Sequence, residues 1–142
     1  YDITTRLVGS EMCIRDRLNE LYKTEPALYE LDSSPEGFTW INCNSANTSL
    51  LSYVRKGKKE SDTLLIICNF TPMEHKAYKL ATPSGGRWQE IFSSDNNRYG
   101  GEGRNNKTVK QAKKAECDGQ EHYISVTVPP LSISVFKKKI GK

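Results

Sequence analysis

The sequence predicts an all-β fold, an antiparallel two-sheet sandwich preceded by a short helical segment. One reason is spacing, because short strand-like runs recur from residue 38 to residue 138 with glycine-rich, proline-rich or charged turns between them. A second reason is the apolar run within residues 63–72, Leu-Leu-Ile-Ile-Cys, which is typical of a strand buried on both faces. The helical pattern, by contrast, occupies only residues 18–24.

The composition limits the classes of protein that the chain can represent. Of 142 residues, 36% are hydrophobic and 27% are charged, and the net charge of +4 is too small to indicate a nucleic-acid partner. No signal-peptide core and no run of about 18 apolar residues occurs, so no membrane partner is expected. The four cysteines have no paired spacing, which indicates reduced thiols in a cytoplasmic protein.

The first part of the chain differs from the rest. Residues 8–17, VGSEMCIRDR, resemble the translation of a transposase mosaic end, an adaptor used in sequencing libraries. We therefore interpret residues 1–17 as a non-native leader outside the fold, with a disordered native terminus as the alternative. Residues 18–24 fit one helical face that ends before Pro26. Because a helix of under two turns is unstable alone, we interpret residues 18–34 as the end of a longer helix and a linker.

The apolar run at residues 63–72 is the predicted central strand. One face carries Leu64, Ile66, Cys68 and Phe70, and the other carries Leu65 and Ile67. A small sandwich normally covers one face of each strand, so a further layer, inside this chain or lost from it, is expected on the second face. We expect the chain alone to expose an apolar patch there and to associate.

The other predicted strands are short. They are residues 38–42, 49–56, 77–80, 88–92, 122–128 and 131–138. The last two are predicted to form a hairpin across Pro129-Pro130, and their inward side chains are Ile124, Val126, Val128, Leu131, Ile133 and Val135. Residues 42–47 and 93–119 are predicted to be loops, the second of them unusually long.

Few residues suit catalysis. His75 and His122 with scattered cysteines have no zinc-ligand spacing, so neither a metal nor a cofactor is expected. Asp95 and Glu102 in the glycine-rich loop could pair as catalytic carboxylates, but a loop acid is more often bonded to its own turn. The basic residues of 104–114 have no interleaved aromatics and are read as a solvated charge run, not as a nucleic-acid site.

The aromatic residues are the one suggestive set. Trp40, Trp88 and Tyr99 each offer a flat apolar ring with a polar edge, which would suit the apolar face of a sugar. The two tryptophans lie on predicted strands, where burial is favoured, whereas Tyr99 lies in the long loop and could contact a sugar or a neighbouring domain. These three are the candidate substrate-binding residues, and no catalytic residue is assigned.

A series of short motifs runs in order along residues 18–138: LNELY at 18, PAL at 26, ELD at 30, WI at 40, RKG at 55, NFTP at 69, GRW at 86, YGG at 99 and SVTVPPL at 125. Together they resemble the C-terminal part of a bacterial 1,4-α-glucan (glycogen) branching enzyme of the α-amylase superfamily. The resemblance implies that residues 18–34 are the remnant of the last helix of a catalytic barrel and its linker. Residues 35–139 would then be the C-terminal β-sandwich domain, and residues 140–142 a tail.

The resemblance also implies an activity for the whole enzyme. It would cleave an α-1,4 linkage and transfer the freed chain to a 6-hydroxyl through a covalent glycosyl-enzyme. Such chemistry requires two carboxyl groups about 5–5.5 Å apart, carried by barrel strands that this chain lacks. The fragment is therefore expected to be inactive alone, with the missing barrel of the same polypeptide as its partner. α-Glucan (glycogen) is a further candidate partner.

Three alternatives stay open at this point. A carbohydrate-binding module with its own glucan affinity would bind glucan without the barrel. A sandwich adhesion domain would be indicated by secretion or disulfides. Related debranching or trehalose-releasing hydrolases share the same architecture.

Overall fold

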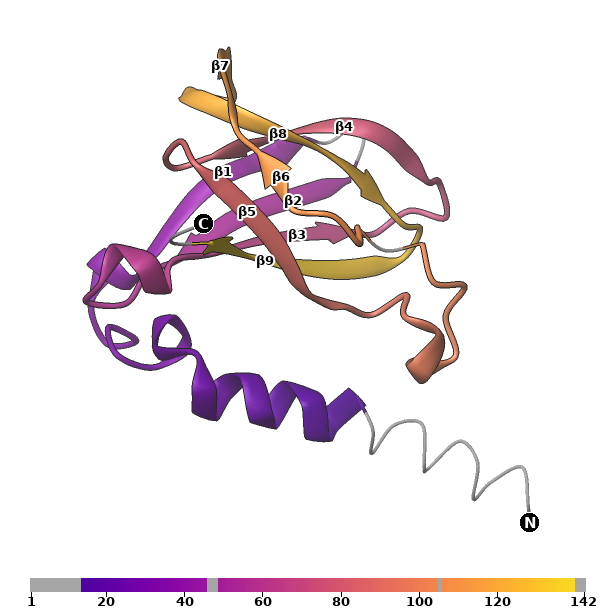
Figure 1. Ribbon diagram of the computed structural model, residues 1–142, viewed down its shortest axis with the longest axis horizontal. Helices are drawn as coiled ribbons and strands as arrows, with labels where there is room; N and C mark the ends of the chain where they lie inside the picture. The colour runs from indigo at the N-terminus through magenta and orange to yellow at the C-terminus, as the bar shows by residue number, and fades with distance from the viewer. Residues whose placement is uncertain (1–13, 46–48, 105, 140–142) are drawn as a thin grey trace.

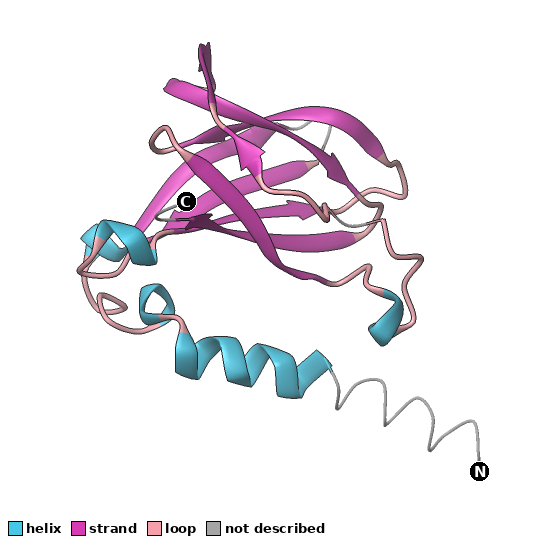
Figure 2. Ribbon diagram, in the orientation of Figure 1, coloured by secondary structure: helices cyan, strands magenta, loops and turns pink. Residues whose placement is uncertain are grey.

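The computed structural model describes residues 14–45, 49–104 and 106–139, and they form three layers (Figure 1). The helix of residues 14–24 lies on one side of a six-stranded antiparallel sheet, and a three-stranded antiparallel sheet lies on the other side (Figure 2). The predicted two-sheet β fold with a short helix before it is confirmed.

The six-stranded sheet has the strand order β1-β2-β3-β9-β5-β6, and the three-stranded sheet has the order β4-β8-β7. The strands are β1 (Phe38–Ser45), β2 (Leu50–Arg55), β3 (Leu64–Asn69), β4 (His75–Thr82), β5 (Arg87–Ser93), β6 (Lys110–Gln111), β7 (Lys113–Cys117), β8 (Gln120–Val128) and β9 (Ser132–Lys139). Short 3₁₀ turns are η1 (Pro26–Leu28), η2 (Pro35–Gly37), η3 (Glu60–Asp62) and η4 (Asn97–Tyr99).

The main core lies between the two sheets. Val54 of β2 pairs with Leu65 of β3, and Ile67 lies two residues further along the same face. These residues pack with Trp88 and Phe136 against the second sheet, and all of them are buried. The second sheet contributes the predicted inward residues of β8, which are Ile124, Val126 and Val128. The alternation predicted for the central strand is therefore confirmed.

The opposite face of β3 is covered from within the chain. Leu64 and Ile66 are buried against Leu21 of the helix and Ala27 of η1. With the inner face covered by the second sheet, residues 64–67 have no open side. Of the two expected alternatives, a layer inside this chain is the correct one here. The apolar patch expected on this face is therefore not found at residues 64–67, because the short helix covers them.

The helix ends where the sequence predicts. Glu25 is extended, with φ −104° and ψ 104°, and Pro26 starts η1, since proline disfavours a helical conformation in the residue before it. The helix is longer than predicted at its other end, where residues 14–17 are helical and Arg17 donates a hydrogen bond to the Ile91 carbonyl. These four residues of the predicted leader are therefore part of the fold and not outside it. The rest of the predicted leader, residues 1–13, lies outside the described residues, as does the predicted tail at 140–142.

The predicted hairpin across Pro129-Pro130 is wrong. β8 pairs with β4 and β7, whereas β9 lies between β3 and β5 in the other sheet. The two prolines cannot donate to a strand ladder, and Leu131 has a left-handed φ of +45°, so the chain crosses between sheets instead of folding back. Leu131, predicted to face inward, is 68% exposed, and the inward residue of β9 is Phe136. Val135 is buried on the helix side of the sheet.

The long predicted loop contains two strands that the sequence pattern missed. β6 pairs with β5 at the edge of the large sheet, and β7 pairs with β8 at the edge of the small one. Both are short edge strands with lysines and no apolar alternation, which is typical of edges protected against further pairing. Residues 42–45, also predicted as loop, continue β1 past a register shift.

Candidate functional site

The three aromatic candidates lie in different environments. Trp88 on β5 is 0% exposed inside the main core, so its ring offers no face to a sugar and it is withdrawn as a binding residue. Trp40 on β1 is 50% exposed. Tyr99, in η4, is partly buried and packs on Phe92 with ring centroids 5.8 Å apart.

Trp40 and Tyr99 lie at opposite ends of the helix-facing side of the large sheet. Trp40 begins a row of side chains across this side, and Tyr99 packs on Phe92, which ends the row. Strand register defines this row as Trp40, Tyr53, Ile66, Val135 and Phe92. Four inter-strand steps of about 4.8 Å separate its ends by roughly 19 Å. Leu21 of the helix packs on the middle of the row. The two aromatic candidates therefore do not form one binding surface.

Trp40 is part of a small aromatic cluster at the β1 edge. Its ring meets Phe38 edge-on at 5.0 Å and Tyr53 edge-on at 5.9 Å, and those two rings stack at 5.0 Å. Burial raises the pKa of the Tyr53 hydroxyl above its ordinary value. The cluster holds the indole in one orientation while leaving half of it open to solvent.

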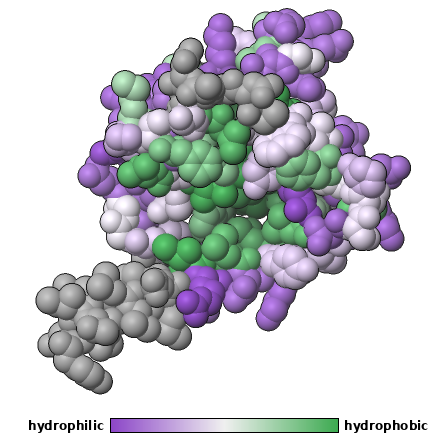
Figure 3. Space-filling view, turned by 180° about the vertical axis from the view of Figure 1, so that it is seen from behind, coloured by the Kyte–Doolittle hydropathy of each residue, from purple (hydrophilic) through white to green (hydrophobic). Residues whose placement is uncertain are grey.

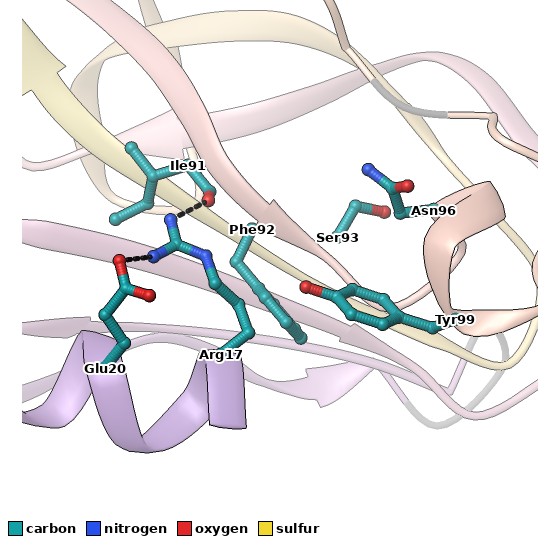
Figure 4. Close-up of a pocket in the computed structure, with 7 residues that line it drawn as sticks. All are labelled: Arg17, Glu20, Ile91, Phe92, Ser93, Asn96 and Tyr99. Carbon is teal, nitrogen blue, oxygen red and sulfur yellow. Dashed lines mark hydrogen bonds and ion pairs between the residues drawn. The ribbon is translucent and has the colours of Figure 1, made fainter. Parts of the chain in front are cut away.

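Tyr99 lines a polar cavity of about 340 Å³ between the helix and β5 (Figure 4). Its ring projects from η4 with the hydroxyl directed back toward the helix. On the helix side, Arg17 donates a hydrogen bond to the Ile91 carbonyl at 3.0 Å and pairs with Glu20 at 3.0 Å. Ser93 and Asn96 also line the cavity, so donors and acceptors surround an aromatic ring, as sugar hydroxyls require.

The glycine-rich loop is built around Asp95. Its carboxylate accepts hydrogen bonds from the backbone N–H groups of Glu102 at 3.4 Å and Arg104 at 3.0 Å. Gly101 lies so close to the Asp95 carbonyl that a Cβ would collide with it. Glu102 itself pairs with Arg104. Asp95 is thus bonded to its own turn, and the loop serves to hold η4 in place.

A network around Asn69 is a feature that residue-by-residue reasoning missed. Its amide donates to the carbonyls of Met73 and Pro129, both at 2.9 Å, and its side-chain oxygen accepts from the N–H and hydroxyl of Thr71 at 2.9 and 2.8 Å. The N–H of Leu131 donates to the Thr71 carbonyl at 2.8 Å. Asn69 therefore ties the β3–β4 connection to the β8–β9 connection. The signal was present in the sequence as the motif NFTP.

An apolar groove of about 350 Å³ lies next to this network, between the two connections that Asn69 joins. Its apolar lining consists of Cys68, Phe70, Leu131 and Ile133. Phe70 is 62% exposed and Leu131 is 68% exposed, which is unusual for large apolar side chains that are firmly held. The left-handed conformation of Leu131 adds roughly 1–2 kcal/mol of backbone strain. A band of apolar residues with a hollow in it is also visible on the side of the molecule shown in Figure 3.

Glu90 on β5 forms a second link between the sheets. Its carboxylate accepts from the backbone N–H of Asn106 at 3.1 Å and from the Asn106 amide at 2.9 Å. Asn106 in turn donates to the Thr127 carbonyl at 3.0 Å and accepts from the Thr127 N–H at 2.9 Å. Burial raises the pKa of Glu90 from 4.5 to about 7, although the Asn106 hydrogen bonds and Lys110 act in the opposite direction.

The described residues form no metal centre, and two of their cysteines are free thiols. Within them, no three His, Cys, Asp or Glu side chains converge as metal ligands would. Cys68 and Cys117 are free thiols, and burial raises the pKa of each. Across the same ranges, 14–45, 49–104 and 106–139, no helix combines the length and apolar character needed to cross a membrane.

Comparison with known proteins supplies the family. Residues 40–139 match the family described as alpha amylase, C-terminal all-beta domain. The chain is 44% identical over 125 residues to the 1,4-alpha-glucan branching enzyme of Oceanobacillus iheyensis, covering 88% of this chain and 20% of that enzyme. It is 40% identical over 129 residues to the branching enzyme of Aquifex aeolicus, covering 91% and 20%. For a branching enzyme of Prochlorococcus marinus the identity is 39% over 127 residues, covering 89% and 17%. The chain thus spans a fifth or less of these relatives.

Proposed function

The chain belongs to the family of alpha amylase C-terminal all-beta domains, and on that premise we propose that it is the C-terminal β domain of a 1,4-α-glucan branching enzyme. In this role it supports a catalytic barrel located elsewhere in the same polypeptide. The observation that carries the proposal is the identity of 39–44% to branching enzymes over most of this chain.

The reaction itself is assigned to the barrel. The whole enzyme would cleave an α-1,4 linkage and transfer the freed chain to a 6-hydroxyl, which a retaining enzyme performs with two free carboxyl groups about 5–5.5 Å apart. Three carboxylates among the described residues are engaged in structural contacts. Asp95 holds its own loop, Glu102 pairs with Arg104, and Glu90 binds Asn106.

A chimera tests this assignment. Residues 18–142 of this chain would replace the matching C-terminal fifth of the Oceanobacillus iheyensis enzyme, and branching would be followed by the loss of the amylose–iodine colour. We expect the chimera to branch amylose and the isolated 142-residue chain to be inactive. The relative truncated before its matching region should be insoluble or inactive. A truncated relative as active and as stable as the chimera would refute the supporting role.

A second candidate function is α-glucan binding by this domain itself, favoured by the polar cavity beside Tyr99. Titration with maltoheptaose would detect it. If the ring stacks on a sugar, Tyr99→Ala should abolish saturable binding while Tyr99→Phe retains most of it. A chain that shows no saturable binding at millimolar maltoheptaose has only the supporting role.

We also propose a cytoplasmic location for the parent protein. The free thiols of Cys68 and Cys117 support a reducing environment.

A further inference from the structure

We propose that the apolar groove between Phe70 and Leu131 is the surface on which the catalytic barrel of the same polypeptide packs. This inference rests on the proposed function and identifies the face that serves it. The occupant is a set of apolar side chains from the barrel.

The groove continues a face that is already an interface. Leu51, Cys68 and Ile133 are aligned across three strands, one row along from the row that the helix covers. Leu21 and Ala27 bury the neighbouring row, but these three residues remain only partly buried. The helix therefore covers part of the sheet and leaves the adjoining part open on the same side.

The exposed residues are held in place by the fold. Asn69 fixes both connections from which Phe70 and Leu131 project, through bonds to Thr71 and Pro129. Leu131 keeps a left-handed conformation although its side chain gains little cover within the described residues. A strained backbone that presents an apolar side chain outward is a feature of docking surfaces, where a partner provides the burial that the domain lacks.

The chemistry of the groove favours a protein surface over a sugar. The polar groups around it are engaged within the chain: Ser94 accepts from the Ile133 N–H at 2.9 Å, Ser132 donates to the Pro129 carbonyl at 2.7 Å, and Asn69 is fully bonded. A glucan needs donors and acceptors for its hydroxyls, and this groove offers apolar contact instead. The partner in the same polypeptide is favoured because this chain represents only 17–20% of each of the relatives described above.

Thiol footprinting provides the direct test, because Cys68 lies in the groove lining and Cys117 lies on β7 of the other sheet. Both thiols are partly exposed, and burial raises the pKa of both, so Cys117 is an internal control. The isolated chain and the chimera would each be treated with N-ethylmaleimide and analysed by peptide mass spectrometry. We expect the Cys68-to-Cys117 labelling ratio to fall about tenfold or more in the chimera relative to the isolated chain, since a covered thiol reacts only when the interface opens.

Variants of the chimera provide a second readout. Phe70→Ser and Leu131→Ser should each lower the temperature at which branching activity is lost, whereas Lys114→Ser, a change at an exposed residue on β7 of the other sheet, should not. An active chimera with an unchanged Cys68 ratio would overturn the docking proposal and leave the proposed function intact. An inactive chimera would instead count against the proposed function. Protection of Cys68 in a dimer of the isolated chain would assign the groove to a second copy and overturn the proposal.

Discussion

Replacing Glu90 by glutamine is predicted to remove a pH dependence from the stability of this domain. The carboxylate is largely buried between β5 and the segment that carries Asn106, and burial raises its pKa from 4.5 to about 7. Between about pH 4.5 and pH 7, Glu90 is therefore protonated in the folded state and ionised in the unfolded state. The contribution of the protonated Glu90 to stability is fully present below about pH 4.5 and is lost as pH rises through about 7.

The size of this effect follows from the two pKa values. A difference between 4.5 and about 7 corresponds to about 3 kcal/mol at ~1.4 kcal/mol per pKa unit. Partial solvent access makes this an upper bound. Glutamine has the shape of the protonated carboxyl group, but its amide can accept only one of the two Asn106 hydrogen bonds, so Glu90→Gln should be less stable than the parent protein by about 1–2 kcal/mol near pH 5. Between pH 5 and pH 8 the parent protein should lose about 1–3 kcal/mol of stability that Glu90→Gln does not lose.

Urea unfolding at the two pH values, followed by tryptophan fluorescence, measures the difference. Glu121→Gln changes an exposed carboxylate on β8 and serves as the control. Parallel pH profiles for the parent protein and Glu90→Gln would refute the reasoning. They would mean that the two Asn106 hydrogen bonds already compensate the carboxylate for its burial.

Three further predictions concern stability. Leu21→Ala should lower the free energy of unfolding in urea by about 2–4 kcal/mol, because it leaves a cavity above Leu64 and Ile66 on the helix-facing side of β3. Tyr22→Ala, at an exposed residue of the same helix, should lower it by under about 1 kcal/mol. Equal effects of the two changes would show that the helix does not stabilise the sheet by packing. Asn69→Ala should cost about 2–4 kcal/mol, since four hydrogen bonds are lost at a buried site; a change below about 1 kcal/mol would show that the two connections are held independently. Gly101→Ala should speed tryptic cleavage within the glycine-rich loop, because the new Cβ displaces the Asp95 carbonyl; unchanged cleavage would show that the loop absorbs it.

The fold was predictable where the pattern was local. The apolar run of β3 predicted a strand buried on both faces, and its alternation assigned each residue to the correct side. The end of the helix at Pro26 was equally local. What the pattern could not give was the partner of each strand. Pro129-Pro130 is compatible with a tight turn or with a crossing between sheets, and the long-range pairing of β8 with β4 and β7, and of β9 with β3 and β5, distinguishes the two.

The candidate site was predictable only in part. Trp88 and Trp40 occupy similar strand positions in the sequence, yet one is buried and the other is half exposed, because Trp88 lies on the face that packs against the second sheet whereas Trp40 lies on the helix-facing side of the edge strand β1. β7, with the sequence KKAEC, has no apolar alternation, so it escaped detection. The apolar groove between Phe70 and Leu131 was missed because leucine is usually a core residue, whereas Leu131 has a left-handed backbone and an exposed side chain.

β9 lies in the middle of the large sheet, between β3 and β5, although it follows both of them in the sequence. Because β9 is synthesised after the strands on either side of it, β1-β2-β3 and β5-β6 remain two separate ribbons until β9 is available to pair with both. Deletion of β9 alone would therefore leave two halves of the large sheet with no strand to join them.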